Sequence, residues 1–162
     1  PEMADERDEE IQGAFQDAQS SWMNALRAHR LAPPDAGFSA RLAELSRAAH
    51  AEAEICWKAH AAGYEWPRHR AAGAEPPYEL RPESGRRGPE IAWQRFDAAV
   101  DALNRATSQT RLDQVGSAYE EMSVAAGLLA GEVEYEDRAS GLLPPRQLPG
   151  RQKPATKARK SA

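Results

Sequence analysis

The sequence predicts an all-α protein: an antiparallel four-helix bundle with a long loop between helices 2 and 3 and a disordered basic C-terminal tail. Three observations support this prediction. Four segments place apolar residues at alternating steps of three and four, which is the spacing of one helix face. Alanine, the residue with the highest helix propensity, makes up much of the 41% hydrophobic share. Short links within the first and last helix pairs favour antiparallel neighbours.

The first two helices are predicted over about 5–31 and 38–63. Pro33 and Pro34 end the first helix, because proline has no N–H to donate. Gly63 ends the second, since glycine tolerates the positive φ of a C-terminal cap. The apolar stripe of the first helix is Ile11, Phe15, Ala18, Trp22, Ala25 and His29, and that of the second is Leu42, Leu45, Ala49, Ala53 and Cys56.

The third helix is predicted to begin at Pro89 and the fourth just after Thr110. Proline suits a first helical position, and Thr110 with Asp113 has the spacing of a capping box. The third stripe is Ala92, Phe96, Ala99, Leu103 and Ala106, and the fourth is Leu112, Val115, Tyr119, Met122, Ala126, Leu129 and Val133. Glycines 116, 127 and 131 each cost this fourth helix about 1 kcal/mol relative to alanine. We interpret them as points where a neighbouring helix comes close.

The predicted domain organisation is one helical domain over 5–138 and a flexible basic tail over 139–162. The link over 64–88 is far longer than bundle connections usually are. After Ser140 the chain turns to Pro, Gly, Gln and basic residues, which is typical of disorder. The expected topology is up-down-up-down. The alternative is a pair of helical hairpins that dimerises, because the fourth stripe is regular enough to accept a partner helix.

Composition narrows the class of protein. The formal net charge is −4, which argues against a dedicated nucleic-acid-binding domain. The single cysteine, Cys56, excludes an intramolecular disulfide and suits a reducing cytoplasm. No apolar run has the length of a membrane span and no signal peptide is recognised, so a cytoplasmic protein without membrane contact is expected. The richness in Ala, Arg, Gly and Pro favours a bacterial source.

Catalytic and metal-binding motifs are not found in the sequence. None of the four histidines has the Glu-x-x-His spacing of a di-iron bundle. Cys56 and His60 lie one helical turn apart, as do His50 and Glu54, but zinc sites usually need three or four protein ligands. A thiol enzyme that uses Cys56 with His60 as the base has no recognisable third member. It stays as the weakest alternative, and we expect no enzyme, cofactor or metal.

The central loop over 64–87 interleaves aromatic residues with arginines. Such residues stack on bases and pair with phosphates, so the loop is a candidate partner- or ligand-binding site. Its candidate residues are Trp66, Arg68, His69, Arg70, Tyr78, Arg81, Arg86 and Arg87. One functional hypothesis is therefore a sensor that holds a phosphorylated small molecule here. The competing interpretation is that Trp66 and Tyr78 fold back to cap the bundle.

The C-terminal segment is the second candidate site. It holds Arg151, Lys153, Lys157, Arg159 and Lys160 and no acid, which suits attraction to phosphate backbones. Its Ala158-Arg159-Lys160-Ser161 stretch resembles a core histone tail, and the segment looks like the Lys/Ala/Pro arms of bacterial nucleoid proteins. That resemblance implies contact with nucleic acid and covers only this end. The leading hypothesis is a non-enzymatic regulatory bundle that docks a protein partner or itself, with a tail that contacts nucleic acid.

Overall fold

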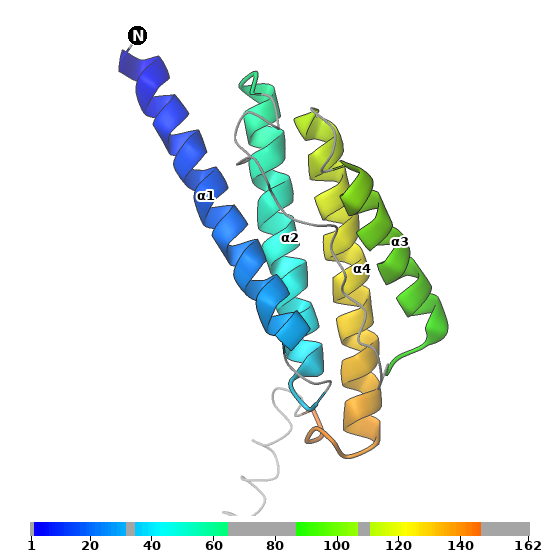
Figure 1. Ribbon diagram of the computed structural model, residues 1–162. Coiled ribbons are helices and arrows are strands. Elements are labelled where there is room, and N and C mark those ends of the chain that lie inside the picture. Colours follow the sequence, from blue (N-terminus) through cyan, green and yellow to red (C-terminus); the bar gives the residue numbers. More distant parts are fainter. Residues whose placement is uncertain (1, 32–34, 65–86, 107–110, 147–162) are drawn as a thin grey trace, which may run out of the picture.

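Four helices and no strand make up the part of the chain that the computed structural model describes, residues 2–31, 35–64, 87–106 and 111–146 (Figure 1). They are α1 (Glu2–Leu31), α2 (Phe38–Ala61), α3 (Glu90–Ala106) and α4 (Leu112–Ala139). This confirms the all-α class. The predicted helix bounds are matched within a few residues. In the described residues, no helix has an apolar stretch long enough to cross a membrane.

The helix ends follow from local sequence in most cases. Gly63 has a φ of +85° and its N–H donates to the carbonyl of His60, which confirms glycine as the end signal of α2. The carbonyl of Pro89 accepts the first hydrogen bonds of α3. Helix α4 begins just after Thr110 as predicted, but the predicted capping box was wrong, because Arg111 occupies the N-cap position and no side chain caps it. Thr110 lies outside the described residues.

The helices pack in the spatial order α1, α2, α4, α3, with α2 and α4 forming the most extensive interface (Figure 1). Neighbours in this order run antiparallel. The hydroxyl of Tyr64, just after α2, donates to Asp8 near the start of α1. At the opposite end, the Phe38 ring at the start of α2 stacks on Trp93 in the first turn of α3, at 6.2 Å between centroids. Helices α2 and α3 therefore run parallel.

The chain order consequently differs from the expected up-down-up-down topology. The two hairpins α1–α2 and α3–α4 are antiparallel as predicted, but α3 starts at the end of the bundle where α2 also starts (Figure 1). The link between α2 and α3 must return the chain along the full length of α2, about 36 Å for 24 residues. A short turn cannot span that distance. The topology therefore requires a link of at least about ten residues, and the observed link exceeds that minimum.

The predicted apolar stripes form the core. Every residue of the four stripes is buried except Ala92, which is half-buried. Aromatic rings join α1 to the other helices: Trp22 meets Tyr119 of α4 edge-on at 5.5 Å, and His29 lies 6.3 Å from Phe96 of α3. The regular stripe of α4 is thus covered by helices of the same chain. A dimer of hairpins would have to use another face of α4.

Small residues allow α2 and α4 to approach closely. A Cβ on Gly116 would lie 2.6 Å from the indole nitrogen of Trp57, and one on Gly127 would lie 3.0 Å from Oγ of Ser46. Oγ of Ser46 donates to the carbonyl of Ser123 at 2.6 Å, and Oγ of Ser123 donates to the carbonyl of Ser46 at 2.8 Å. The interpretation of these two glycines as close-approach positions is confirmed.

Gly131 does not fit that interpretation. A Cβ built on it would meet nothing within 4 Å. Its side of α4 faces outward, away from α2 and α3, and the residue is exposed. The prediction of a neighbouring helix at Gly131 was therefore wrong, and the glycine instead leaves a hollow in the surface.

Candidate partner-docking face

The predicted loop site enters the described structure only at its two ends. Tyr64 donates to Asp8, and this hydrogen bond raises the pKa of Tyr64 to about 12. Arg87 lies at the base of the bundle. Both side chains are engaged within the protein. The remaining candidates, Trp66, Arg68, His69, Arg70, Tyr78, Arg81 and Arg86, lie outside the described residues, as do Arg151, Lys153, Lys157, Arg159 and Lys160 of the tail.

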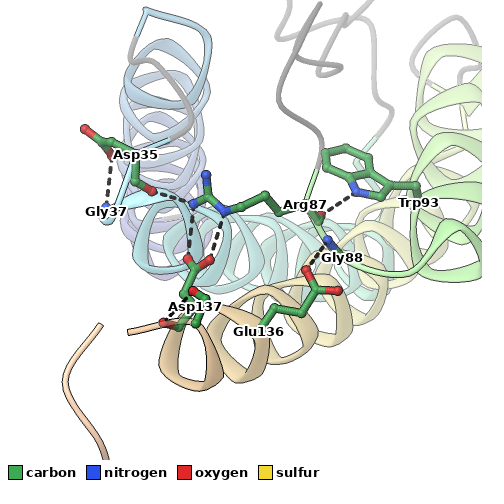
Figure 2. A network of polar contacts seen from close by, with 8 residues as sticks. Asp35, Gly37, Arg87, Gly88, Trp93, Glu136 and Asp137 are labelled. Carbon is green, nitrogen blue, oxygen red and sulfur yellow. Dashed lines mark hydrogen bonds and ion pairs between the residues drawn. The ribbon is translucent and has the colours of Figure 1, made fainter. Parts of the chain in front are cut away.

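Arg87 forms a buried ion pair with Asp137 near the end of α4 (Figure 2). Its Nε and Nη2 donate to the two carboxylate oxygens at 2.9 and 3.1 Å, a bidentate geometry. Nη2 also donates to the carbonyl of Asp35 at 2.6 Å, and the guanidinium lies 5.4 Å from the centre of the Phe38 ring. Asp137 is 1% exposed. Arg87 therefore links the start of α2 to the end of α4, and its side chain has a structural role.

The residues beside Arg87 hold its backbone in place (Figure 2). The indole N–H of Trp93 donates to the carbonyl of Arg87 at 2.7 Å, and the N–H of Gly88 donates to Glu136 at 2.8 Å. Gly88 has a φ of +103°, and a Cβ there would lie 3.2 Å from Leu129. Glycine is required by both the backbone conformation and the space. No local sequence pattern indicates this cluster, because its members are far apart in the chain.

Cys56 and His60 are not placed as a nucleophile and its base. Cys56 is fully buried against α4, whereas His60 is exposed. Burial raises the pKa of the Cys56 thiol far above its ordinary value, and the charge of Glu52 raises it further. A thiol held in this way has almost no nucleophilic thiolate at neutral pH. Geometry and electrostatics therefore give no support to a thiol enzyme at this position.

His50 bridges the two central helices at the surface. Its Nδ1 lies 3.0 Å from Glu120 of α4, and its Nε2 lies 2.9 Å from Glu54 one turn along α2. The hydrogen bond to Glu120 raises the pKa of His50, and the charges of both carboxylates act in the same direction. Within the described residues, no group of three or more His, Cys, Asp or Glu side chains is placed to hold a metal ion.

The outward face of α4 is the most distinctive surface of the described chain. Val124, Leu128 and Tyr135 lie on it at helical spacing and are 40, 50 and 75% exposed. Gly131 sits between the last two and completes a 4-3-4 row. Burying a side chain of this size contributes about 1.5–3 kcal/mol. Val124 and Leu128 are already about half-buried, so covering the row would contribute only part of this free energy for each of them.

Hollows lie at both ends of this row. The hollow near the start of α4 has a volume of about 630 Å³ and is lined by Trp57, Arg105 and Ser117 among others. The hollow near the end of α4 has a volume of about 540 Å³ and is lined by Gly131, Tyr135 and Pro145 among others. We call the row and its two hollows, from Ser117 to Tyr135, the outer face of α4.

Glutamates flank the apolar row. Glu121 and Glu132 are exposed beside it, and Glu120 and Glu134 are half-buried on the side toward α2. The whole helix bears seven acidic residues and one basic residue, Arg138. An apolar strip between acidic margins is complementary to a strip between basic margins. In the sequence, this face corresponds to a second row of residues, each of which lies two positions after a member of the core stripe.

Comparison of the chain with family models, curated proteins and solved structures finds no match.

Proposed function

We propose that this chain is a non-enzymatic binding protein that docks a helix of another protein on the outer face of α4 and contacts nucleic acid through its basic C-terminal segment. The observation that supports docking most directly is the exposed row of Val124, Leu128 and Tyr135. Contiguous exposed apolar side chains with a polar rim are typical of protein interaction sites. The spacing suits an amphipathic helix laid into a groove.

The partner proposed is an amphipathic helix with lysines or arginines on both sides of its apolar stripe. Its apolar side chains would enter the hollow beside Gly131 and pack on Leu128. Its basic residues would pair with Glu121 and Glu132 at the rim. Such rim pairs contribute mainly to specificity and association rate, whereas the apolar contacts supply the affinity.

Charge favours this partner over a second copy of the chain. Two α4 helices packed outer face to outer face would bring Glu121 and Glu132 of each copy toward the same glutamates of the other. Like charges across an interface are unfavourable. Self-association through this face is therefore the less favoured arrangement.

The docking proposal is tested with a synthetic helix that has leucines at steps of three and four and lysines on both margins. We expect Leu128→Asp to weaken its binding at least tenfold, because the change puts a charge at the centre of the row. Ile91→Asp is the matched control, since Ile91 is also an exposed apolar residue but lies on α3. Isothermal titration calorimetry gives the Kd of each.

A second peptide, with glutamates in place of the lysines, tests the role of charge. It should bind far more weakly than the lysine peptide. Equal losses for L128D and I91D, or equal binding of the two peptides, would contradict docking at this face. Sedimentation velocity of the protein alone reports any self-association.

The nucleic-acid part of the proposal depends on the five basic residues of the C-terminal segment. Each phosphate neutralised releases condensed counterions, so binding weakens steeply with salt. The test is fluorescence anisotropy of a labelled DNA duplex at two salt concentrations. The full chain is compared with the variant in which Arg151, Lys153, Lys157, Arg159 and Lys160 are all replaced by Gln.

We expect the logarithm of the association constant to fall with the logarithm of salt concentration at a slope of about −4.5 if all five contacts form. The glutamine variant should lose binding altogether. Binding that survives this variant would place the nucleic-acid contact elsewhere or remove it.

A further inference from the structure

The chain turns back toward α4 after the helix ends. Gly141 has a φ of +86°, which allows the reversal. The N–H of Leu143 then donates to the carbonyl of Asp137 at 2.9 Å, and Nη1 of Arg138 donates to the carbonyl of Pro144. Nη2 of Arg146 lies 3.8 Å from Oε1 of Glu134, a residue in the last turns of α4. The last described residue is therefore beside α4.

The returning chain forms one wall of the hollow at the end of the outer face. Pro145 and Arg146 line it together with Gly131 and Tyr135. This hollow is mainly apolar, and the glycine leaves it open. Leu148 is the second residue after Arg146 and is apolar. The sequence thus has an apolar residue two positions after Arg146, which lines the apolar hollow.

Charge complementarity extends along the rest of the face. The segment that follows Arg146 has five basic residues and no acidic one. The outer face has Glu120, Glu121, Glu132 and Glu134 along its margins. From Glu134 to Glu120 the helix rises about 20 Å, while residues 147–162 extend to at most about 55 Å. The basic residues can therefore reach every glutamate of the face.

We infer that residues 147–162 bind the outer face of α4 of the same molecule, with Leu148 at the Gly131 hollow and the basic side chains against the glutamates. The segment then covers the apolar row. Opposite charges linked on one chain meet at a high effective concentration, so modest contacts are sufficient. This binding has a regulatory consequence, which rests on the proposed function. Nucleic acid that binds the basic residues releases the segment and exposes the outer face of α4 to a partner.

The test uses the full chain with Thr156→Cys and a nitroxide spin label. Cys56 is buried with a raised thiol pKa, so a chain without T156C, treated in the same way, controls for labelling at Cys56. We expect the amide signals of Ser117, Glu121, Val124 and Leu128 to lose at least half of their intensity relative to the reduced label. Amides on exposed positions of α1 and α3 should keep theirs.

The matched control has the same label with the five basic residues changed to Gln, and the broadening should disappear. Equal broadening on all helices, or none on α4, overturns the inference. Spin-labelled chain mixed with ¹⁵N-labelled chain separates the two sources of contact. Broadening that appears in this mixture as strongly as in the single molecule overturns binding within one molecule.

Adding a DNA duplex to the labelled chain tests the coupling. Release of the broadening as the duplex binds supports it, and broadening that persists with bound duplex overturns it. The two proposals fail separately. If no duplex binds, the nucleic-acid part of the function falls while the spin-label result still decides the tail contact. If the lysine peptide binds but α4 is never broadened, only the tail contact falls.

Discussion

Glycines occur both on the inner face of α4, which packs against α2, and on its outer face, but their surroundings differ. On the inner face, Gly116 and Gly127 let α2 approach, and Ser123 satisfies its hydroxyl across the interface. On the outer face, Gly131 has no neighbour and large apolar side chains lie in water. Glycine thus occurs on both faces of one helix, against a neighbouring helix on the inner face and in open space on the outer face.

The difference shows that residue size alone does not reveal which face of a helix is internal. Close packing needs matched shapes, and α2 supplies Trp57 and Ser46 to fill the space that the inner glycines leave. Nothing in the described chain fills the hollow at Gly131. The same residue type therefore marks a close contact on one face and open space on the other.

The largest effect is expected from breaking the ion pair of the inner face. Asp137→Leu leaves Arg87 without its carboxylate in a largely buried site, which should cost about 3 kcal/mol of unfolding free energy. Urea denaturation followed by circular dichroism measures the loss. The double variant Arg87→Met/Asp137→Leu removes both charges and should recover part of it. A double variant no more stable than the single one would contradict a role for the charge pair.

The next effect sharpens the comparison of the glycines. Gly116→Leu forces a side chain against the indole of Trp57 and Cβ of Cys56, at 2.6 and 3.2 Å for Cβ alone. We expect a loss of about 2 kcal/mol from overpacking. Gly131→Leu is the matched control on the outer face and should cause no loss. Equal denaturation midpoints for the two variants would contradict the difference in packing between Gly116 and Gly131.

A smaller effect of the opposite sign is expected at Gly131. Gly131→Ala adds a methyl group to open space, so the gain in helix propensity, about 1 kcal/mol, should appear in the free energy of unfolding. Gly127→Ala should not show the gain, because its Cβ would lie 3.0 Å from Oγ of Ser46 and disturb the serine pair. Thermal and urea unfolding distinguish them. A similar gain at both positions would argue against a tight interface at Gly127.

The smallest effect concerns the edge of the interface, at His50. Its pKa is raised in the folded state by Glu120 and then Glu54, so the stabilisation is complete below the ordinary pKa and is lost as pH rises through the raised value. The exposed site limits this to about 0.5 kcal/mol. NMR titration of His50 should show a higher midpoint than in Glu120→Gln. An unchanged titration midpoint would contradict an interaction of His50 with Glu120 between α2 and α4.

Much of the fold could be predicted because it depends on local pattern. The stripe of α1 from Ile11 to His29 and that of α4 from Leu112 to Val133 are both buried as expected. The candidate loop and tail residues stay predictions, apart from Arg87, which the structure engages with Asp137. That pair joins residues 50 positions apart, and no local pattern indicates which carboxylate an arginine will meet.

The sequence by itself determined where the helices lie and which residues form their core stripes, since propensity and spacing act within a few turns. Only the tertiary structure decided that α3 runs parallel to α2, that Gly131 faces outward, and that a second apolar row on α4 remains exposed. These properties depend on which segments pack together. The serine pair of α2 and α4, 77 positions apart in the chain, shows the range over which such packing acts.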